Sequence, residues 1–245
     1  MTASPLVLVV GGSGRTGART LQQLLARGCR VRAIVRPAAS LPAAVAADPA
    51  LERIDAALLS LDDDALRRHV EGCTAVVSCL GHTISLRGVF GPPRDLVTRA
   101  TTRLCRAIEA SNPAAAVAFV LMSSVSVHRA RALDPRRTRF ERMVLWLLRR
   151  LVPPVEDNQR AAQVLLQTIG ADHPRVHWVV VRPDALRDGE VGPYTVHEAL
   201  VDPLFSPWQT RMANVAHFIA TLATEPEVLA RWRGRCPVIV DARPG

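Results

Sequence analysis

A short apolar run that leads straight into a glycine-rich loop constrains this chain more than any other feature. Residues 6–10 read Leu-Val-Leu-Val-Val, residues 11–17 read Gly-Gly-Ser-Gly-Arg-Thr-Gly, and an amphipathic pattern follows. This order predicts a strand, a tight turn and a helix. Gly11, Gly14 and Gly17 lie three residues apart. That spacing suits a sharp turn after the strand, close approach of the backbone to a pyrophosphate, and tight packing of the helix on the strand.

The start of the predicted helix suits an anion. Its free N–H groups and the positive end of its dipole face the loop, where phosphates bind in dinucleotide-binding proteins. The loop therefore predicts dinucleotide binding; the alternative is a turn with a purely structural role.

Apolar runs alternate with amphipathic segments along almost the whole chain, which is typical of a parallel sheet with helices on both faces. We expect an α/β fold, a Rossmann-type doubly wound parallel sheet with a small C-terminal elaboration. The 245 residues fit a single domain, 1–245, with substrate-side elements at about 128–155 and 183–235. The predicted strands are 6–10, 30–35, 53–59, 75–79, 116–122, 178–182, 194–196 and 237–240. The predicted helices are about 15–27, 62–72, 95–111, 140–151, 156–169, 211–223 and 225–232.

Composition excludes several classes of protein. The five cysteines are dispersed and form no C-x-x-C pair, so we expect no metal site and no disulfide framework. A reduced, cytoplasmic setting follows. No segment has the apolar length of a transmembrane helix, so we expect no integral membrane segment. The net charge of +9 is spread along the chain without a nucleic-acid motif, so we expect no nucleic-acid partner and infer a basic surface that suits an anionic cofactor.

The end of the second predicted strand indicates whether the chain binds NAD or NADP. This strand ends in Val35-Arg36-Pro37, about 20 residues beyond the glycine loop, where an acid would select NAD. No acid is present, and a guanidinium such as that of Arg36 can hold a 2′-phosphate in a bidentate fork. Arg15 is a second candidate. We therefore predict NADP(H); in the alternative interpretation, Arg36 is only a solvated surface arginine.

Several segments together resemble the atypical short-chain dehydrogenase/reductases, in particular the NAD(P)H-binding group that includes NmrA-like proteins and biliverdin reductase B-like flavin reductases. They are residues 9–17, 35–37, 76–81, 120–124, 181–183 and 213–216. The resemblance implies a pyrophosphate loop at Gly11, Ser13, Gly14, Arg15 and Thr16. It implies a 2′-phosphate contact at Arg36, helped by Ser40, and a wall beside the riboses at Cys79, Leu80 and Gly81. It also implies that Ser123 touches substrate or nicotinamide and that Arg182 and Pro183 border the nicotinamide.

The chain departs from the family pattern at the catalytic pair. In that pattern a Tyr and a Lys lie four residues apart on the helix after the fifth strand. Val155 and Gln159 stand at those positions here, and neither replaces the acid or the charge. Leu59 stands where an aspartate usually meets the adenine.

Three side chains are candidates for the catalytic role: Ser123, His128 and Tyr194. His82 and Asp157 are further sources of a proton. Each has a plainer interpretation as a surface, packing or helix-capping residue. Quinones and flavins accept a hydride and then take a proton from solvent, so we expect an NADPH-dependent reductase of a small conjugated or quinone-like molecule. The alternatives are a non-catalytic NADPH-sensing regulatory protein and a non-redox isomerase or cyclase.

Residues 140–151 form a predicted helix that is apolar on more than one face and is flanked by arginines. Burial against the domain, as a lid or a core-facing helix, is the first expectation. A homodimer face and a helix that lies on a membrane surface are the alternatives.

Overall fold

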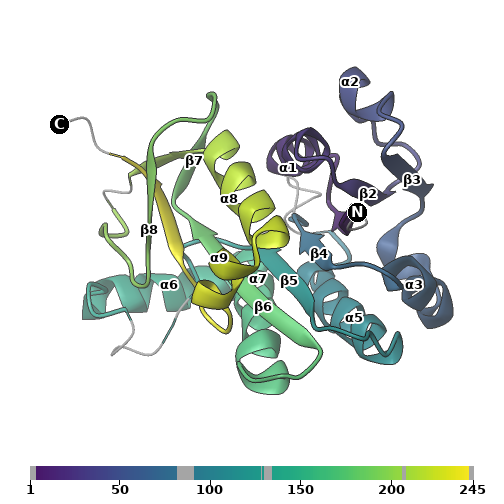
Figure 1. Cartoon of the computed structure of the whole chain (residues 1–245). Coiled ribbons are helices and arrows are strands. Elements are labelled where there is room, and N and C mark those ends of the chain that lie inside the picture. The colour runs from purple at the N-terminus through teal and green to yellow at the C-terminus, as the bar shows by residue number, and fades with distance from the viewer. Residues whose placement is uncertain (1–3, 82–90, 128, 130–133, 206–207, 243–245) are drawn as a thin grey trace.

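The computed structural model describes residues 4–81, 91–127, 129, 134–205 and 208–242. Its centre is an eight-stranded sheet in the order β3-β2-β1-β4-β5-β6-β10-β8 (Figure 1). Neighbouring strands are parallel except that β8 runs antiparallel to β10. The strands are β1 Leu6–Val10, β2 Arg30–Val35, β3 Leu51–Asp55, β4 Ala75–Ser78, β5 Val117–Met122, β6 Val176–Pro183, β8 Tyr194–His197 and β10 Val238–Asp241. The predicted Rossmann-type fold is thereby confirmed.

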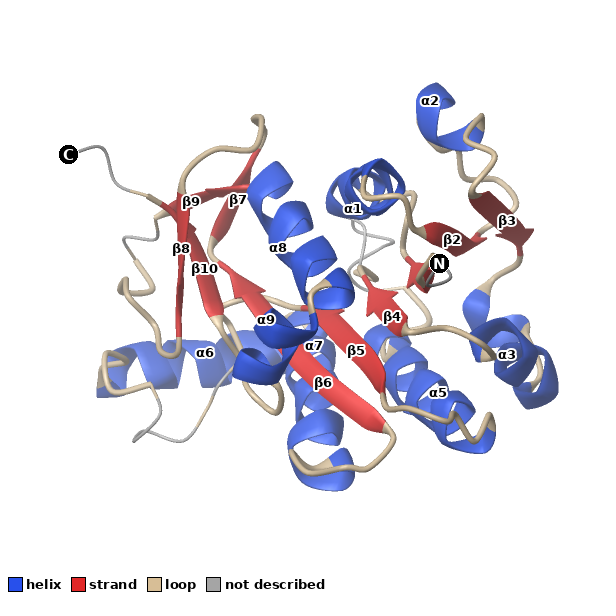
Figure 2. Ribbon diagram, viewed as in Figure 1, coloured by secondary structure: helices blue, strands red, loops and turns tan. Residues whose placement is uncertain are grey.

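Helices cover both faces of this sheet, as Figure 2 shows. One apolar core packs α1 and α8 against the sheet, and the other packs α3, α5 and α7 against its opposite face. Because both faces are covered, β1, β4 and β5 are apolar at nearly every position rather than at alternate ones. The helices are α1 Arg15–Ala26, α2 Ala43–Ala46, α3 Asp63–Val70, α5 Leu96–Ala110, α6 Arg139–Leu151, α7 Pro153–Gln163, α8 Met212–Thr224 and α9 Pro226–Trp232.

The C-terminal elaboration is tied to the sheet through one buried carboxylate. Asp241 accepts hydrogen bonds from the Asn214 side chain at 2.6 Å and the Arg211 N–H at 3.0 Å, and it pairs with Arg187 at 2.8 Å. These contacts join β10 to α8 and to the two-stranded sheet of β7 (Ala185–Arg187) and β9 (Gln209–Arg211). The Asn214 side chain therefore has a structural role.

The third strand begins and ends earlier in the chain than the sequence predicts. The sequence predicts residues 53–59, whereas β3 covers Leu51–Asp55 and residues 58–60 form a 3-10 turn, η1. β3 is an edge strand, partly exposed along its whole length, so it lacks the apolar run that identifies the other parallel strands. Pairing stops at Asp55, opposite Val35, because Pro37 soon ends β2.

The helix at the end of the chain's basic stretch differs from expectation. α6 packs against α7, and only Glu141 and Leu145 on it are buried. The expectation of a core-facing helix over 140–151 is therefore wrong, because most of its apolar side chains are open to solvent. Pro153 ends α6 and begins α7, which runs without a break into a π-helical segment, η2 (Val164–Ile169).

Candidate functional site

The glycine loop between β1 and α1 is packed so tightly that it admits no side chain at two positions. Gly11 has φ of +78°, and a Cβ there would lie 2.5 Å from the backbone carbonyl carbon of Cys79. At Gly17 a Cβ would lie 2.1 Å from the Gly11 carbonyl oxygen. The third glycine, Gly14, donates its N–H to the same oxygen at 3.1 Å. The loop is thus drawn against the end of β4 and the start of α1, as the sequence predicts.

The N-terminus of α1 has no side-chain cap, in contrast to α3 and α6. Gly14 is its N-cap residue, and no acid lies in its first turn. By contrast, Asp62 caps α3 at 2.6 Å from the Ala65 N–H, and Thr138 and Glu141 form a capping box on α6. The first N–H groups of α1 are therefore left for a ligand, and the helix dipole favours an anion there.

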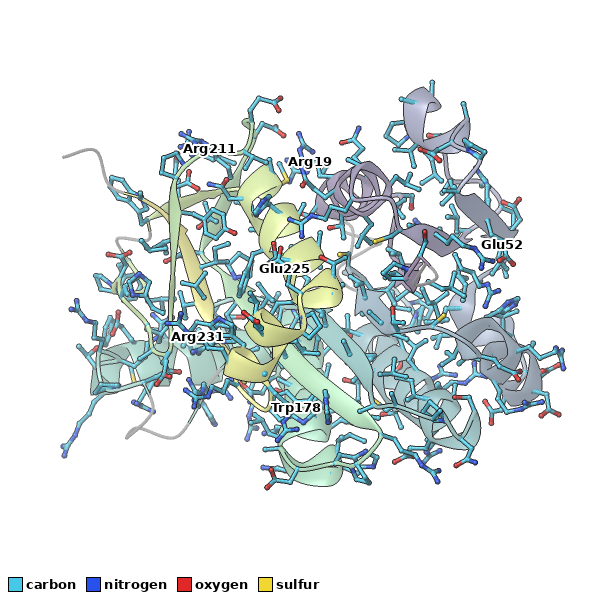
Figure 3. All side chains as sticks on the ribbon, viewed as in Figure 1. Arg19, Glu52, Trp178, Arg211, Glu225 and Arg231 are labelled. Atoms are coloured by element: carbon cyan, nitrogen blue, oxygen red, sulfur yellow. The ribbon has the colours of Figure 1, made fainter. Side chains whose placement is uncertain are left out.

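Two arginines lie beside this loop. Arg15, in the first turn of α1, is exposed. Arg19, labelled in Figure 3, donates to the Arg15 carbonyl oxygen and pairs with Asp188 at 2.9 Å, which joins α1 to the segment after β7. Arg15 is therefore the arginine of this turn whose guanidinium is open to a ligand.

Arg36 lies exposed just beyond the carboxyl end of β2. The carboxylate of Asp55, at the end of the neighbouring strand, is occupied by Arg53 at 2.7 Å. Arg53 also donates to the Ala39 carbonyl oxygen at 3.0 Å, which anchors the turn after Arg36. Within the part of the chain that the structure describes, Arg36 forms no ion pair with a carboxylate, so its charge is available to an anion.

The end of β4 forms one wall of the loop. The Cys79 N–H donates to the Val10 carbonyl oxygen at 2.9 Å, and the Cys79 thiol lies 3.8 Å from the Thr20 hydroxyl. Burial raises the pKa of this thiol to about 12, so it remains protonated and is no nucleophile. Leu80, which follows, is partly buried, and Gly81 is exposed.

Ser123 directly follows β5 and is 8% exposed. Its N–H donates to the Val181 carbonyl oxygen at 2.8 Å, which fixes it beside β6. Its Oγ atom is buried and has no hydrogen-bond partner among the described residues. A buried hydroxyl without a partner is costly unless a ligand or water satisfies it. Among the predicted catalytic residues, Ser123 therefore has the geometry most suited to a ligand contact.

Arg182 points into the protein. Its side chain is completely buried and forms a two-contact ion pair with Asp134, at 2.7 Å and 3.2 Å. Its Nε donates to the Cys236 carbonyl oxygen at 2.8 Å. Because the guanidinium is engaged in these contacts, only the backbone of Arg182 and Pro183 remains available to border a nicotinamide. The Pro183 carbonyl oxygen accepts the Val125 N–H at 3.2 Å.

Asp184, which was not among the predicted site residues, follows Pro183 at the carboxyl end of β6. Burial raises its pKa to about 6, against the hydrogen bond from the Ala185 N–H, and nearby Asp202 adds to the rise while Arg137 opposes it. Arg137 is buried and donates to the Val125 carbonyl oxygen at 2.9 Å, in the segment after Ser123. In the sequence, the signal that could have pointed to Asp184 is its position directly after the Arg182-Pro183 segment, which the family resemblance places beside the nicotinamide.

The helix that carries the family's catalytic pair, α7, has another role here. Asp157 is buried and accepts hydrogen bonds from the N–H groups of Val97 at 2.8 Å and Thr98 at 2.9 Å. It therefore caps α5 from a neighbouring helix, rather than its own helix as expected. Gln159, at the lysine position, is buried, and Val155 is partly exposed.

The remaining predicted acid–base residues are not brought to Ser123. Tyr194 lies on β8, three strands from β5, which corresponds to roughly 14 Å at ordinary strand spacing. Its hydroxyl is 2.9 Å from His217 Nδ1 on α8, and burial raises its pKa. His128 and His82 lie outside the described residues.

These features fit a nicotinamide dinucleotide. The loop excludes a Cβ at Gly11 and at Gly17, the α1 N-terminus has no side-chain cap, and the buried Ser123 hydroxyl lacks a partner among the described residues. The fold and loop define a Rossmann-type dinucleotide-binding protein. The sequence model of the NAD(P)H-binding family matches residues 11–226, so the chain belongs to this family. The predicted resemblance to the atypical short-chain dehydrogenase/reductases is thereby confirmed.

Solved structures share the fold at low identity. A Lactobacillus casei protein is 17% identical over 97% of this chain and 100% of its own, with a TM-score of 0.72. A Veillonella parvula short-chain dehydrogenase/reductase in complex with NADP is 13% identical over 99% and 96%, with a TM-score of 0.69. A Streptococcus pneumoniae protein named provisionally as an NADH-flavin reductase is 17% identical over 98% and 100%, with a TM-score of 0.65. No curated protein matches the chain.

Proposed function

We propose that this chain binds NADP(H) and reduces a small conjugated or quinone-like molecule. The charge beside the glycine loop carries the proposal. Two exposed arginines, Arg15 and Arg36, lie there, and the end of β2 carries no carboxylate that would select NAD. Gly11, Ser13, Gly14, Thr16 and Gly17 would hold the pyrophosphate. The NADP complex of the Veillonella parvula neighbour supports the same cofactor class.

When bound, the cofactor would supply the hydride. The chain would position the substrate against the nicotinamide and would supply a proton. Ser123 Oγ would donate a hydrogen bond to the substrate or the nicotinamide amide, because it is buried and without a partner among the described residues. The backbone of Arg182 and Pro183 would shape the floor beside it.

Asp184 would hold the proton that the missing tyrosine donates elsewhere in the superfamily. With a pKa of about 6, roughly a tenth of this carboxyl is protonated at pH 7, and the fraction rises as the pH falls toward 6. It follows the strand that pairs with the Ser123 N–H, so both groups belong to the carboxyl edge of the sheet. The charge of Asp202 would raise the pKa of Asp184, and the charge of Arg137 would lower it.

The test is consumption of NADPH with p-benzoquinone or FMN as the acceptor. We expect steady turnover by the native chain. Ser123→Ala should lower kcat about 10-fold or more while NADPH affinity falls by no more than about 5-fold, because one hydrogen bond is lost and the pyrophosphate loop is untouched. Ser126→Ala is the matched control. Unchanged turnover in Ser123→Ala would remove Ser123 from the proposed site.

A sensor that binds NADPH without turnover is the second candidate. It is favoured by Val155 and Gln159, which remove the usual acid and charge from α7. The same assay separates the two: tight NADPH binding without consumption with any acceptor supports the sensor.

A further inference from the structure

An uncovered apolar surface is gathered on α6 and one neighbouring loop. Of the nine large apolar side chains that are exposed in the described part of the chain, seven belong to it, each 37–62% exposed. Phe140 and Phe205 stack with ring centroids 5.8 Å apart, so the loop extends the helix surface. We call it the α6 face. It comprises Phe140, Met143, Trp146, Leu147, Leu148, Leu151 and Phe205.

The α6 face is a continuous stripe. Residues 140, 143, 147 and 151 recur at helical spacing and so lie along one side of the helix. The opposite side carries Glu141 and Leu145, which are buried. α6 lies at one edge of the molecule, at the lower left of Figure 1. Apolar patches of this kind on a protein surface mark a binding partner.

The exposed charges on α6 itself are all positive. Arg139, Arg149 and Arg150 flank it, and within the described residues none of them pairs with a carboxylate. The one acid on the helix, Glu141, is 3% exposed and accepts N–H groups of Thr138 and Leu204. The guanidinium of Arg150 lies 4.7 Å from the centre of the Trp146 ring.

A hollow of about 610 Å³ opens next to the α6 face. Arg94, Trp146, Arg149, Arg150 and Arg160 line it. Three acids line it too: Glu156 pairs with Arg160 at 2.8 Å, Asp157 caps α5, and the half-exposed Asp95 pairs with Arg99 at 3.9 Å, so the four lining arginines leave it an excess of positive charge. It shares no lining residue with the glycine loop or Ser123, so it is separate from the proposed cofactor site.

We propose that α6 docks the protein on an anionic phospholipid surface. The stripe would enter the acyl boundary, and the arginines would meet phosphate headgroups, one of which the hollow would accept. An amphipathic helix with arginines beside its apolar side binds in this way. A second copy of the chain fits less well, because pairing α6 with itself brings arginines against arginines with no exposed acid on the helix to offset them.

The test is co-sedimentation of the full chain with vesicles of phosphatidylcholine alone and with added phosphatidylglycerol. We expect binding only to the anionic vesicles, weakened by added salt. Phe140→Ser/Leu147→Ser and Arg149→Gln/Arg150→Gln should each lower the partition coefficient at least about 10-fold, since one basic residue near such a surface contributes about 5-fold. All four side chains are largely exposed or at the rim, so the fold should survive.

Matched controls lie elsewhere on the molecule. Leu186→Ser removes an exposed apolar side chain of β7, and Arg68→Gln/Arg106→Gln removes two exposed arginines of α3 and α5. Both should bind within about 2-fold of the native chain. Equal binding to neutral vesicles, or binding that the α6 variants leave intact, would overturn the proposal. So would a dimer in sedimentation equilibrium that Phe140→Ser/Leu147→Ser dissociates, together with no vesicle binding.

Discussion

Gly17→Ala tests how the glycine loop is built. The new Cβ would lie 2.1 Å from the Gly11 carbonyl oxygen and 3.0 Å from the Gly12 Cα. An ordinary contact needs about 3.5 Å, so the loop or the first turn of α1 must move by about 1.4 Å. Both neighbours are backbone atoms and cannot rotate away. We expect a loss of roughly 1–3 kcal/mol in the free energy of unfolding.

The same movement should reach the ligand. A displacement of 1 Å in a site costs about 10²-fold in a precisely positioned reaction, and we expect NADPH affinity to fall by a comparable factor. Gly14→Ala is the matched variant inside the loop: its Cβ would lie 3.3 Å from the same oxygen, so a shift of about 0.2 Å suffices and the effect should be under about 5-fold. Gly28→Ala, with open space around it, controls for the added methyl group.

Urea unfolding measures the stability of each variant, and calorimetric titration with NADPH measures its affinity. We expect the loss of NADPH affinity to be largest in Gly17→Ala, smaller in Gly14→Ala and smallest in Gly28→Ala. Gly28→Ala should lose some stability, because its φ of +74° disfavours a side chain, yet keep its affinity. Equal NADPH affinity in Gly17→Ala and the native chain, with the fold intact, would refute the steric argument.

Two further predictions concern buried charge. Arg182→Met leaves Asp134 buried without its cation and should lower the free energy of unfolding, measured by urea unfolding, by about 3–5 kcal/mol. The double variant Arg182→Met/Asp134→Asn removes the unpaired charge and should recover part of that loss. A loss below about 1 kcal/mol in the single variant would contradict this expectation. Asp184 has a folded pKa of about 6 against an ordinary 3.8, so the native state holds its proton more tightly and stability falls as pH rises between those values. Asp184→Asn keeps the oxygen that accepts the Ala185 N–H, and urea unfolding at pH 7 should show a gain of about 1–2 kcal/mol after solvent screening.

The sequence predicted the elements that are buried on both sides. β1 and β2 were predicted at their observed bounds, because apolar runs end there at Gly11 and before Pro37. The predicted bounds of β3 were wrong because an edge strand carries no such apolar run. α2, β7 and β9 were missed, since three or four residues show no period, and β7 and β9 pair across more than 20 residues of chain.

The site was predictable where local sequence determines geometry. The glycine loop and the position of Arg36 depend on neighbouring residues and follow from spacing. Arg182 does not: its partner Asp134 lies 48 residues earlier, and only the fold shows that the guanidinium faces inward. Asp157 likewise caps a helix that begins 61 residues before it, at Leu96. The exposure of α6 depended on what packs beside it, which periodicity alone does not reveal.

No helix among the described residues has both the length and the apolar character needed to cross a membrane.

Recognition of NADP(H) is tested most directly by calorimetric titration of the chain with NADPH and with NADH at one salt concentration. The account predicts that NADPH binds at least about 10-fold more tightly, since a hydrogen bond to a charged group contributes about 1.5–3 kcal/mol. Arg36→Asp should abolish that difference while NADH binding changes little. Equal affinity of the native chain for the two cofactors, or no binding of either, would contradict the account.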